Sequence, residues 1–303
     1  MSVVRGYLAE VRVFPMTLLL LSCIVGGLLG VGVNINWYVM SLVLVNAFCY
    51  LYVAHLNDTL FDYYYKGEYE PDRKLHNVRL DGRYYLARWG FGAEVPNAPI
   101  LPKNYYLVAM VVFSAVGFTI MIYLSTVIGF MYSLLAITGL VLALTYSAGV
   151  DKLPVVGDIY WQVGVIFALY CGYYSQTMRF DLNIVIMSVP LFIYLLTFKM
   201  LDSLPDTVVD DMRNKRTLTV LLHRRGLNIS TIRHLCFIPS YVALSMLAVL
   251  APPKVAPGAI AAMIAIAAVH LGLRRDHEGR LSMTLTAIVT ALFILYTIIS
   301  FYI

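Results

Sequence analysis

The chain has 303 residues, of which 60% are hydrophobic and only 13% are charged, and its mean hydropathy is +0.78. A soluble domain carries about 25% charged residues, so this composition excludes an ordinary soluble protein and indicates a polytopic membrane protein. The net charge of +5 does not indicate a nucleic-acid partner, because the basic residues lie between apolar stretches, where membrane orientation explains them.

Nine apolar stretches are long enough to cross the roughly 30 Å hydrocarbon core of a bilayer, and each predicts a membrane-spanning helix. In chain order they are approximately 14–33, 37–56, 105–123, 126–146, 159–176, 182–200, 235–250, 257–273 and 281–302. The predicted fold is therefore all-α, with nine transmembrane helices around a central cavity. We expect residues 1–303 to form one domain, capped by cytoplasmic loops at about 57–104 and 202–234.

The basic residues predict how the chain is oriented in the membrane. If the amino terminus is cytoplasmic, only Arg179 and Lys254 among the lysines and arginines fall in segments on the outer side. Cytoplasmic segments are enriched in these residues. The sequence therefore predicts a cytoplasmic amino terminus and an outer carboxyl terminus.

Aspartates follow two of the predicted spans. The second span ends in HLNDTLFDYYYKGEYE, where Asp58 and Asp62 are four residues apart. The sixth ends in LDSLPDTVVDDMRNKRTL, where Asp202, Asp206 and Asp210 recur every fourth residue. On an α-helix a step of four residues returns to the same face, so each segment is predicted to present a row of carboxylates. Both spans run from outside to inside, so both rows are expected on the cytoplasmic side.

The second acidic row is followed at once by three cations, Arg213, Lys215 and Arg216. Hard cations such as Mg²⁺ take oxygen ligands and hold phosphates through one or two carboxylates together with water. Acidic residues near membrane depth are costly and usually mark a functional site. The combination predicts a site for a diphosphate carried by divalent metal ions.

The second acidic segment resembles a motif of the UbiA superfamily of intramembrane prenyltransferases, which have nine transmembrane helices and two aspartate-rich motifs. Asp202, Asp206 and Asp210 match its DxxxDxxxD pattern, and the NKRTL that follows stands where the family often has GKRTL. The resemblance covers nearly the whole chain in span number, motif order and topology, and its specificity lies mostly in this second motif.

The first acidic segment departs from the family pattern NDxxDxxxD. Asn57 and Asp58 fit its opening, but Phe61 occupies the second aspartate position and Asp62 lies one residue later. Either a local shift in the helix restores the geometry, or Asp58 and Asp62 act as an i,i+4 pair. Tyr65 or the following lysine stands where the third acidic residue is expected.

Three further positions are similar to basic or aromatic positions of the family. Tyr146 and Lys152, in TYSAGVDKLPVVGD, resemble its tyrosine-plus-lysine segment at a longer spacing. Arg12, at the mouth of the first span, sits where the family often has an arginine near the acceptor pocket. Arg79, in NVRLDG, is loosely similar to an arginine in a family loop.

The resemblance implies transfer of a prenyl group from an allylic isoprenyl diphosphate to a lipophilic acceptor, with Mg²⁺, in two ions, as the cofactor. The implied metal ligands are Asp58, Asp62, Asp202 and Asp206. The implied catalytic side chains are these four with Lys152, as a phosphate contact, and Tyr146, which would shield the carbocation. The implied substrate-binding residues are Asn57, Arg12, Arg79, Asp210, Arg213, Lys215 and Arg216.

Several alternatives remain open from the sequence. An aromatic quinone precursor such as dihydroxynaphthoate is the first choice of acceptor, a geranylgeranylglyceryl phosphate-type ether lipid is the second, and heme or chlorophyll-type acceptors come after these. A cation or proton transporter is the alternative of another class, although transporters place charges near mid-bilayer on broken helices rather than at span ends. A non-catalytic lipid-diphosphate binder is the third. The oligomeric state stays open.

Overall fold

The computed structural model is built of helices. It describes residues 13–65, 102–150, 153–205, 207–212, 216–251, 253–272 and 280–302. Within these ranges the chain is helical with no strand, which confirms the all-α class. The long helices are α2 (Val13–Val31), α3 (Trp37–Leu60), α6 (Lys103–Ile128), α7 (Phe130–Ser147), α8 (Val156–Thr177), α9 (Leu182–Ser203), α13 (Ile238–Leu250), α14 (Ala256–Gly272) and α15 (Arg280–Tyr302). Three short helices, α10 (Thr207–Met212), α11 (Leu218–Arg224) and α12 (Ile229–Leu235), lie between α9 and α13.

Each of the nine predicted apolar stretches corresponds to one of the long helices, most of which extend a few residues beyond the stretch. In the part of the chain that the structure describes, four segments are long and apolar enough to cross a membrane, namely Trp37–Leu60, Lys103–Ile128, Leu182–Ser203 and Ile229–Leu250. Shorter apolar helices cover Met16–Val31, Phe130–Tyr146, Ala256–Gly272 and Leu285–Thr297. Nine membrane crossings therefore remain a prediction.

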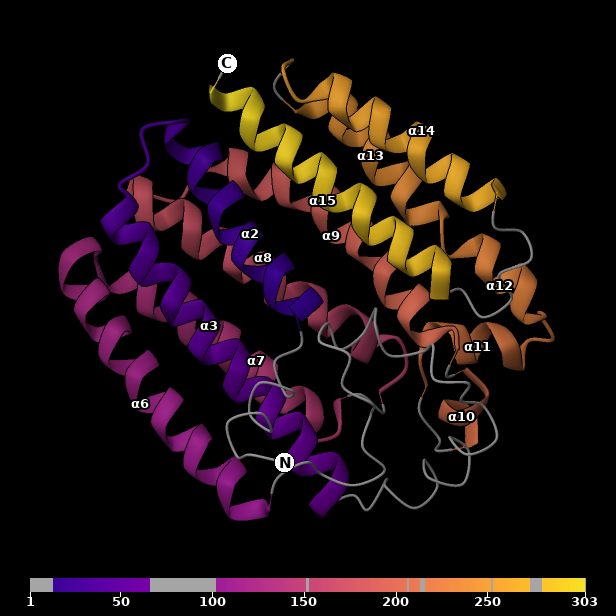
Figure 1. Ribbon diagram of the computed structural model, residues 1–303, viewed down its shortest axis with the longest axis horizontal. Coiled ribbons are helices and arrows are strands. Elements are labelled where there is room, and N and C mark those ends of the chain that lie inside the picture. The colour runs from indigo at the N-terminus through magenta and orange to yellow at the C-terminus, as the bar shows by residue number, and fades with distance from the viewer. Residues whose placement is uncertain are drawn as a thin grey trace.

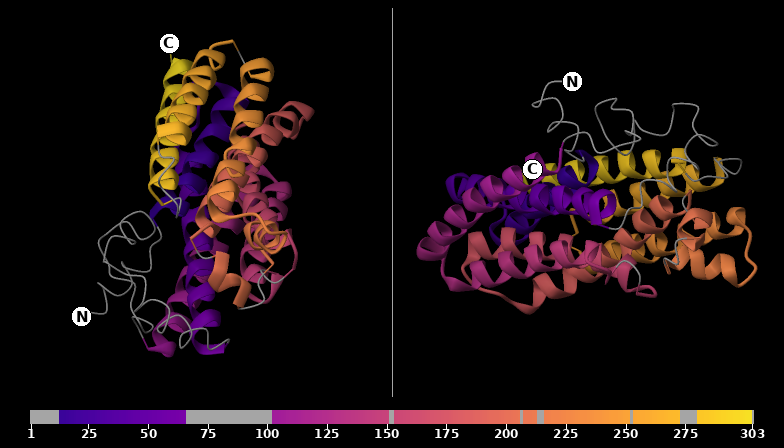
Figure 2. Two further views of the ribbon diagram at one scale, coloured as in Figure 1. Left: turned by 90° about the vertical axis from the view of Figure 1, so that its right-hand side faces the viewer. Right: turned by 90° about the horizontal axis from the view of Figure 1, so that it is seen from below.

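The long helices lie side by side and run obliquely across Figure 1. In the amino-terminal half, α2 packs on α8, α3 on α6, and α7 on α8. In the other half, α9 packs on α13, α13 on α14, and α14 on α15, which returns beside α9 and α2. The helices α8 and α9 join the two halves, and the views in Figure 2 show the same layered bundle.

Two glycines let α2 and α8 approach until their backbones touch. A Cβ atom built on Gly26 of α2 would lie 2.1 Å from the carbonyl oxygen of Leu169, and one built on Gly172 of α8 would lie 1.9 Å from the carbonyl oxygen of Cys23. Small residues favour helix association in lipid in this way, because close packing replaces the hydrophobic effect as the driving force. The α2–α8 contact therefore has no room for a side chain at either glycine.

The helix α3 does not end as a regular α-helix. It continues as a π-helix, η1 (Phe61–Tyr65), and the backbone N–H of Phe61 donates to the carbonyl oxygens of both Asn57 and Asp58. A π-helix has i→i+5 hydrogen bonds and so accommodates one extra residue per turn, often at functional sites. The backbone between Asp58 and Asp62 is therefore not a regular α-helix, and the pairing of these two carboxylates stays a prediction.

The second acidic row is not carried by one helix, which corrects the expectation from its spacing. The helix α9 ends at Ser203, a turn follows at Leu204 and Pro205, and α10 begins only at Thr207. Proline has no N–H to continue the helical hydrogen bonds and its ring clashes with the preceding turn. The Thr207 hydroxyl donates to the carbonyl oxygen of Leu204 at 2.9 Å, which holds α10 close to the end of α9.

Candidate active site

The last turn of α7 brings the two acidic segments together. The side-chain amide of Asn57, at the end of α3, donates to the carbonyl oxygen of Leu144 at 3.2 Å. From α9, the ammonium group of Lys199 lies 5.9 Å from the centroid of the Tyr146 ring. Leu144 and Tyr146 both belong to the last turn of α7, so the end of α3 and the end of α9 each contact this turn.

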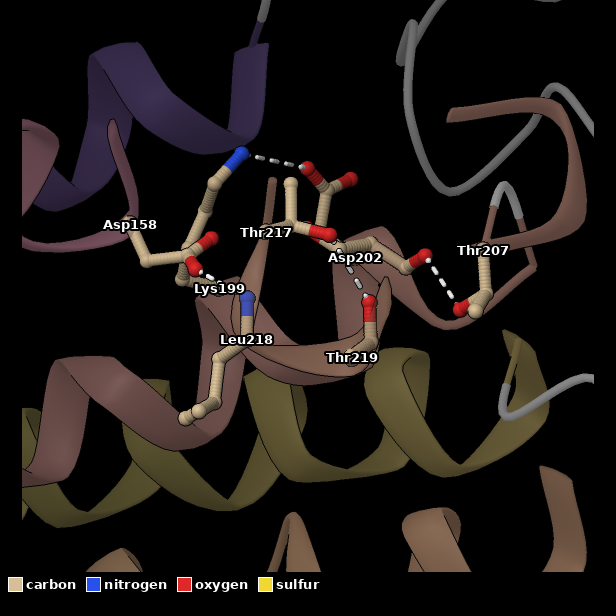
Figure 3. Close-up of polar contacts among 8 residues, drawn as sticks. Asp158, Lys199, Asp202, Thr207, Thr217, Leu218 and Thr219 are labelled. Atoms are coloured by element: carbon tan, nitrogen blue, oxygen red, sulfur yellow. Dashed lines mark hydrogen bonds and ion pairs between the residues drawn. The ribbon is translucent and has the colours of Figure 1, made fainter. Parts of the chain in front are cut away.

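Lys199 and Asp202 form an ion pair on one face of α9. Their side-chain nitrogen and oxygen are 3.8 Å apart, and the side chains are 16% and 35% exposed. Figure 3 shows the ammonium group and the carboxylate facing each other, with the Asp158 side chain on the other side of Lys199. An ammonium group this buried is stable only with opposite charge nearby, so Asp202 stabilises a cation at the candidate site.

Asp158, in the first turn of α8, brings a second acidic side chain close to Lys199. It is 2% exposed, and one of its carboxylate oxygens accepts a hydrogen bond from the backbone N–H of Leu218 at 2.5 Å (Figure 3). Its other oxygen has no hydrogen-bond partner among the described residues. A buried polar atom without a partner is rare and usually marks a bound ion, a water or a catalytic role.

Two hydrogen bonds donated by backbone N–H groups hold the start of α8 against the start of α11. Leu218 donates to Asp158, and in the reverse direction the N–H of Val155 donates to the carbonyl oxygen of Arg216 at 3.1 Å. Val155 has a φ of 63°, a left-handed conformation that costs a β-branched residue roughly 1–2 kcal/mol. Such strain persists where the surrounding contacts fix the backbone. Residues 216–218, the last three of the NKRTL segment, are therefore held beside Asp158.

The helix α10 carries two aspartates with different surroundings. Asp210 is buried, at 8% exposure. The next residue, Asp211, accepts from the Arg224 side chain at 2.7 Å and 2.5 Å, which joins α10 to α11. Asp211 is therefore neutralised by a structural ion pair, whereas Asp210 faces the inside of the fold.

Comparison of the chain with models of protein families shows the family to which it belongs. The model of the UbiA prenyltransferase family matches residues 95–290, well over half of the chain. The chain belongs to the UbiA prenyltransferase family. It is accordingly a prenyltransferase and an integral membrane protein. Among curated proteins, none matches this chain.

Solved structures of UbiA proteins share the fold over nearly the whole chain. A structure of digeranylgeranylglyceryl phosphate synthase is 12% identical, with a TM-score of 0.65 over 99% of both chains. A UbiA homologue from Archaeoglobus fulgidus, bound to GPP and Mg²⁺, is 17% identical, with a TM-score of 0.66 over 98% of this chain and 100% of that one. The apo UbiA homologue from Aeropyrum pernix K1 is 14% identical, with a TM-score of 0.65 over 94% and 98%. At these identities the similarity establishes the fold alone.

Part of the predicted UbiA site lies outside the described residues. Asn57, Tyr146 and Asp202 are brought together around the end of α7, and Asp58 is half-buried one residue after Asn57. Arg216 is exposed two residues before the start of α11. The predicted residues outside the described ranges are Arg12, Arg79, Lys152, Asp206, Arg213 and Lys215, and the side chain of Asp62 is not described either. Within the described part of the chain, no three metal-ligating side chains form a cluster.

The sequence did not single out Asp158 and Lys199, which the structure places at the candidate site of this UbiA protein. Lys199 was counted only as an orienting charge, although it interrupts an apolar stretch three residues before Asp202, which is a usable signal. Asp158 directly precedes the fifth apolar stretch, as the two acidic segments directly follow theirs. Its link to Leu218, 60 residues later, is visible only in the folded chain.

Proposed function

We propose that this UbiA protein transfers a prenyl group from an allylic isoprenyl diphosphate to a lipophilic acceptor, at the joined ends of α3, α7, α8 and α9. The observation that carries the proposal is the convergence on one place of an ion-paired lysine, Lys199, and a buried carboxylate with a free oxygen, Asp158. A diphosphate with its metal ions needs both cationic and carboxylate partners. Family membership supplies the reaction class.

The donor set supports Mg²⁺ as the cofactor, in two ions. Carboxylate oxygens are the ligands that Mg²⁺ prefers, and few per ion are needed when phosphate and water complete the shell. Bound Mg²⁺ neutralises charge on the diphosphate as the carbon–oxygen bond breaks. The proposed metal ligands are Asp58, Asp62, Asp202 and Asp206, and the orphaned oxygen of Asp158 offers a further acidic contact.

The reaction breaks the bond between the allylic carbon and the diphosphate oxygen, and the electron pair stays on the diphosphate. An electron pair of the acceptor forms the new bond to that carbon, and the acceptor loses a proton. Lys199 is placed to stabilise negative charge as it develops on the leaving group. The Tyr146 ring already lies beside a cation and would stabilise the allylic cation through its face.

The remaining predicted residues have supporting roles in this proposal. Asn57 fixes the end of α3 on α7 and, with Asp210, assists binding of the diphosphate. Additional phosphate contacts are proposed for the basic side chains Lys152, Arg213, Lys215 and Arg216, and contacts with the acceptor for Arg12 and Arg79. The acceptor is proposed to be an aromatic quinone precursor. A geranylgeranylglyceryl phosphate-type lipid is the second candidate, favoured by the likeness to digeranylgeranylglyceryl phosphate synthase.

The predicted placement in the membrane is part of the proposal. Residues 1–303 form one transmembrane domain, with the amino terminus and the active-site mouth in the cytoplasm and the carboxyl terminus outside. The excess of lysine and arginine in the predicted inner segments supports this orientation. The segments at about 57–104 and 202–234 cap the mouth.

The test is Mg²⁺-dependent diphosphate release by the detergent-purified protein. The donors are geranyl, farnesyl and geranylgeranyl diphosphate, and the acceptors are 1,4-dihydroxy-2-naphthoate and geranylgeranylglyceryl phosphate. We expect release with one acceptor in the wild type and a loss of it in Asp62→Ala and Asp206→Ala. Asp211→Asn is the matched control, because its carboxylate is engaged by Arg224 and an exposed ion pair contributes only about 0–1 kcal/mol.

Two other results would contradict the proposal. Donor binding without release under either acceptor would indicate a lipid-diphosphate binder. Neither binding nor release, together with cation flux in proteoliposomes, would indicate the transporter.

A further inference from the structure

Gln162 of α8 is a buried side chain that the structure leaves without partners. It is 0% exposed, and neither its amide nitrogen nor its amide oxygen has a hydrogen-bond partner among the described residues. A glutamine amide has two donors and an acceptor oxygen, and leaving a buried polar group unsatisfied is strongly unfavourable. An aliphatic side chain would fill the same place without this cost. The amide therefore calls for a partner that the described part of the chain does not supply.

Gln162 lies one helical turn from Asp158, toward the carboxyl-terminal end of α8. It follows Asp158 by four residues, so both side chains share one face of α8, and a rise of about 1.5 Å per residue puts them roughly 6 Å apart along the axis. The next residues on this face, Val165 and Leu169, are buried and apolar. The polar part of the face is thus confined to the two turns that carry Asp158 and Gln162.

The contact with α2 closes this face of α8 farther along the helix. Leu169 lies on the same face, and its carbonyl oxygen meets the backbone of α2 at Gly26 with no space for a Cβ atom. The face is therefore apolar and closed beyond the turn of Gln162.

We propose that Gln162 hydrogen-bonds a hydroxyl group at the reacting end of the prenyl acceptor. The inference rests on the proposed function, which puts the donor diphosphate beside Lys199, Asp202 and Asp158. The allylic carbon is bonded directly to that diphosphate, and the attacking atom must approach it within about 3–3.5 Å from the far side. The reacting end of the acceptor is therefore expected about one helical turn along α8 from the diphosphate, beside Gln162.

A hydroxyl group matches the chemistry of the Gln162 amide. It accepts from the amide N–H and donates to the amide oxygen, so it satisfies both orphaned atoms. The amide does not titrate in the physiological range, so Gln162 orients the acceptor and the proton lost in the reaction goes elsewhere. A site built to hydrogen-bond a substrate hydroxyl rejects analogues that lack it far more strongly than an apolar pocket does. Gln162 is thus a specificity determinant for oxygen-bearing acceptors.

The test compares Gln162→Leu with the wild type in steady-state kinetics, using the donor and acceptor that support diphosphate release. We expect the acceptor KM to rise roughly 10-fold or more, while the donor KM stays within about twofold, because only the acceptor loses a hydrogen bond. The thermal unfolding midpoint should not fall, because the variant removes an unsatisfied group. Thr197→Val is the matched control, since Thr197 is also 0% exposed with an orphaned hydroxyl, and both KM values should stay unchanged.

An acceptor analogue with its hydroxyl groups methylated gives a second readout. The wild type should lose acceptor affinity on methylation, whereas Gln162→Leu should lose little more, because the two changes remove one interaction. A wild type that releases no diphosphate overturns the proposed function, and the inference with it. An active wild type whose Gln162→Leu variant keeps the acceptor KM overturns the inference alone. The inference is also overturned if Gln162→Leu lowers the unfolding midpoint and raises both KM values equally, because that result indicates a structural role.

Discussion

The carboxylate of Asp158 accepts a hydrogen bond from the backbone N–H of Leu218, 2.5 Å away, across 60 residues of chain. This bond fixes the first turn of α8 to the first residue of α11. It leaves the second carboxylate oxygen buried and without a hydrogen-bond partner in the described structure, beside the Lys199–Asp202 ion pair. One residue thus has a structural and a proposed functional role, which mutation can separate.

Asp158→Asn should preserve the fold and impair the reaction. The asparagine oxygen still accepts from Leu218, but the negative charge is lost, so we expect kcat/KM for the donor to fall roughly 10-fold or more. Asp158→Ala should also lose about 1–3 kcal/mol of stability, because the Leu218 N–H is left without an acceptor. Thermal unfolding and steady-state kinetics on both variants separate the two effects. Equal unfolding midpoints would show that the Leu218 bond does not stabilise the fold.

Lys199→Met should weaken donor binding with little effect on folding. Methionine keeps much of the apolar stem in place but removes the ammonium group that we propose faces the diphosphate. The donor KM should rise about 10-fold or more while the acceptor KM changes little. Lys199→Arg, which keeps the charge, is the control and should retain most of the donor affinity. A donor KM that is unchanged in Lys199→Met would show that this cation does not contact the donor.

Removal of divalent metal should abolish diphosphate release, and added Mg²⁺ should restore it, because the carboxylates at the ends of α3 and α9 alone repel the diphosphate. Asp202→Asn removes one proposed ligand. The Mg²⁺ concentration for half-maximal rate should therefore rise roughly 10-fold in this variant. A titration of the rate with Mg²⁺ measures both effects. Full activity in excess chelator would contradict a metal-dependent reaction.

Gly172→Ala should destabilise the protein, because its Cβ atom would lie 1.9 Å from the carbonyl oxygen of Cys23. Overpacking of this kind costs about 1–3 kcal/mol or more, since two backbones must separate. Gly164→Ala on the same helix is the control. Nothing lies within 4 Å of its Cβ position, and alanine is favoured over glycine in a helix by about 1 kcal/mol. Thermal unfolding in detergent should therefore show opposite shifts, and equal shifts would contradict the close packing.

The helices of this protein were predictable because each follows from a local apolar stretch. The stretch at 37–56, for example, corresponds to α3 (Trp37–Leu60), with Asn36 capping its start through the N–H of Val39. The short helices α10, α11 and α12 were not predicted, because segments of six or seven residues are too short to show a clear periodicity and their ends depend on tertiary contacts.

The site was predictable only where its residues are grouped in the sequence. The aspartate rows and the NKRTL segment have a recognisable spacing, and the comparisons confirm the family. The turn at Pro205 and the π-helix that starts at Phe61 changed the geometry inferred from those spacings. Asp158 and Gln162 were missed because a single polar residue beside an apolar stretch acquires its meaning from partners far along the chain.

The contact between α2 and α8 also limits how substrates reach the site. With the backbones touching at Gly26 and Gly172, the two helices cannot slide past each other without breaking both contacts. The helices α2 and α8 therefore keep their positions relative to each other in the bundle. Long lipid substrates must enter, and the longer product must leave, between other helices. Crosslinks that join α2 to α8 should accordingly permit turnover. A crosslink between the two helices that flank the substrate entrance should stop turnover.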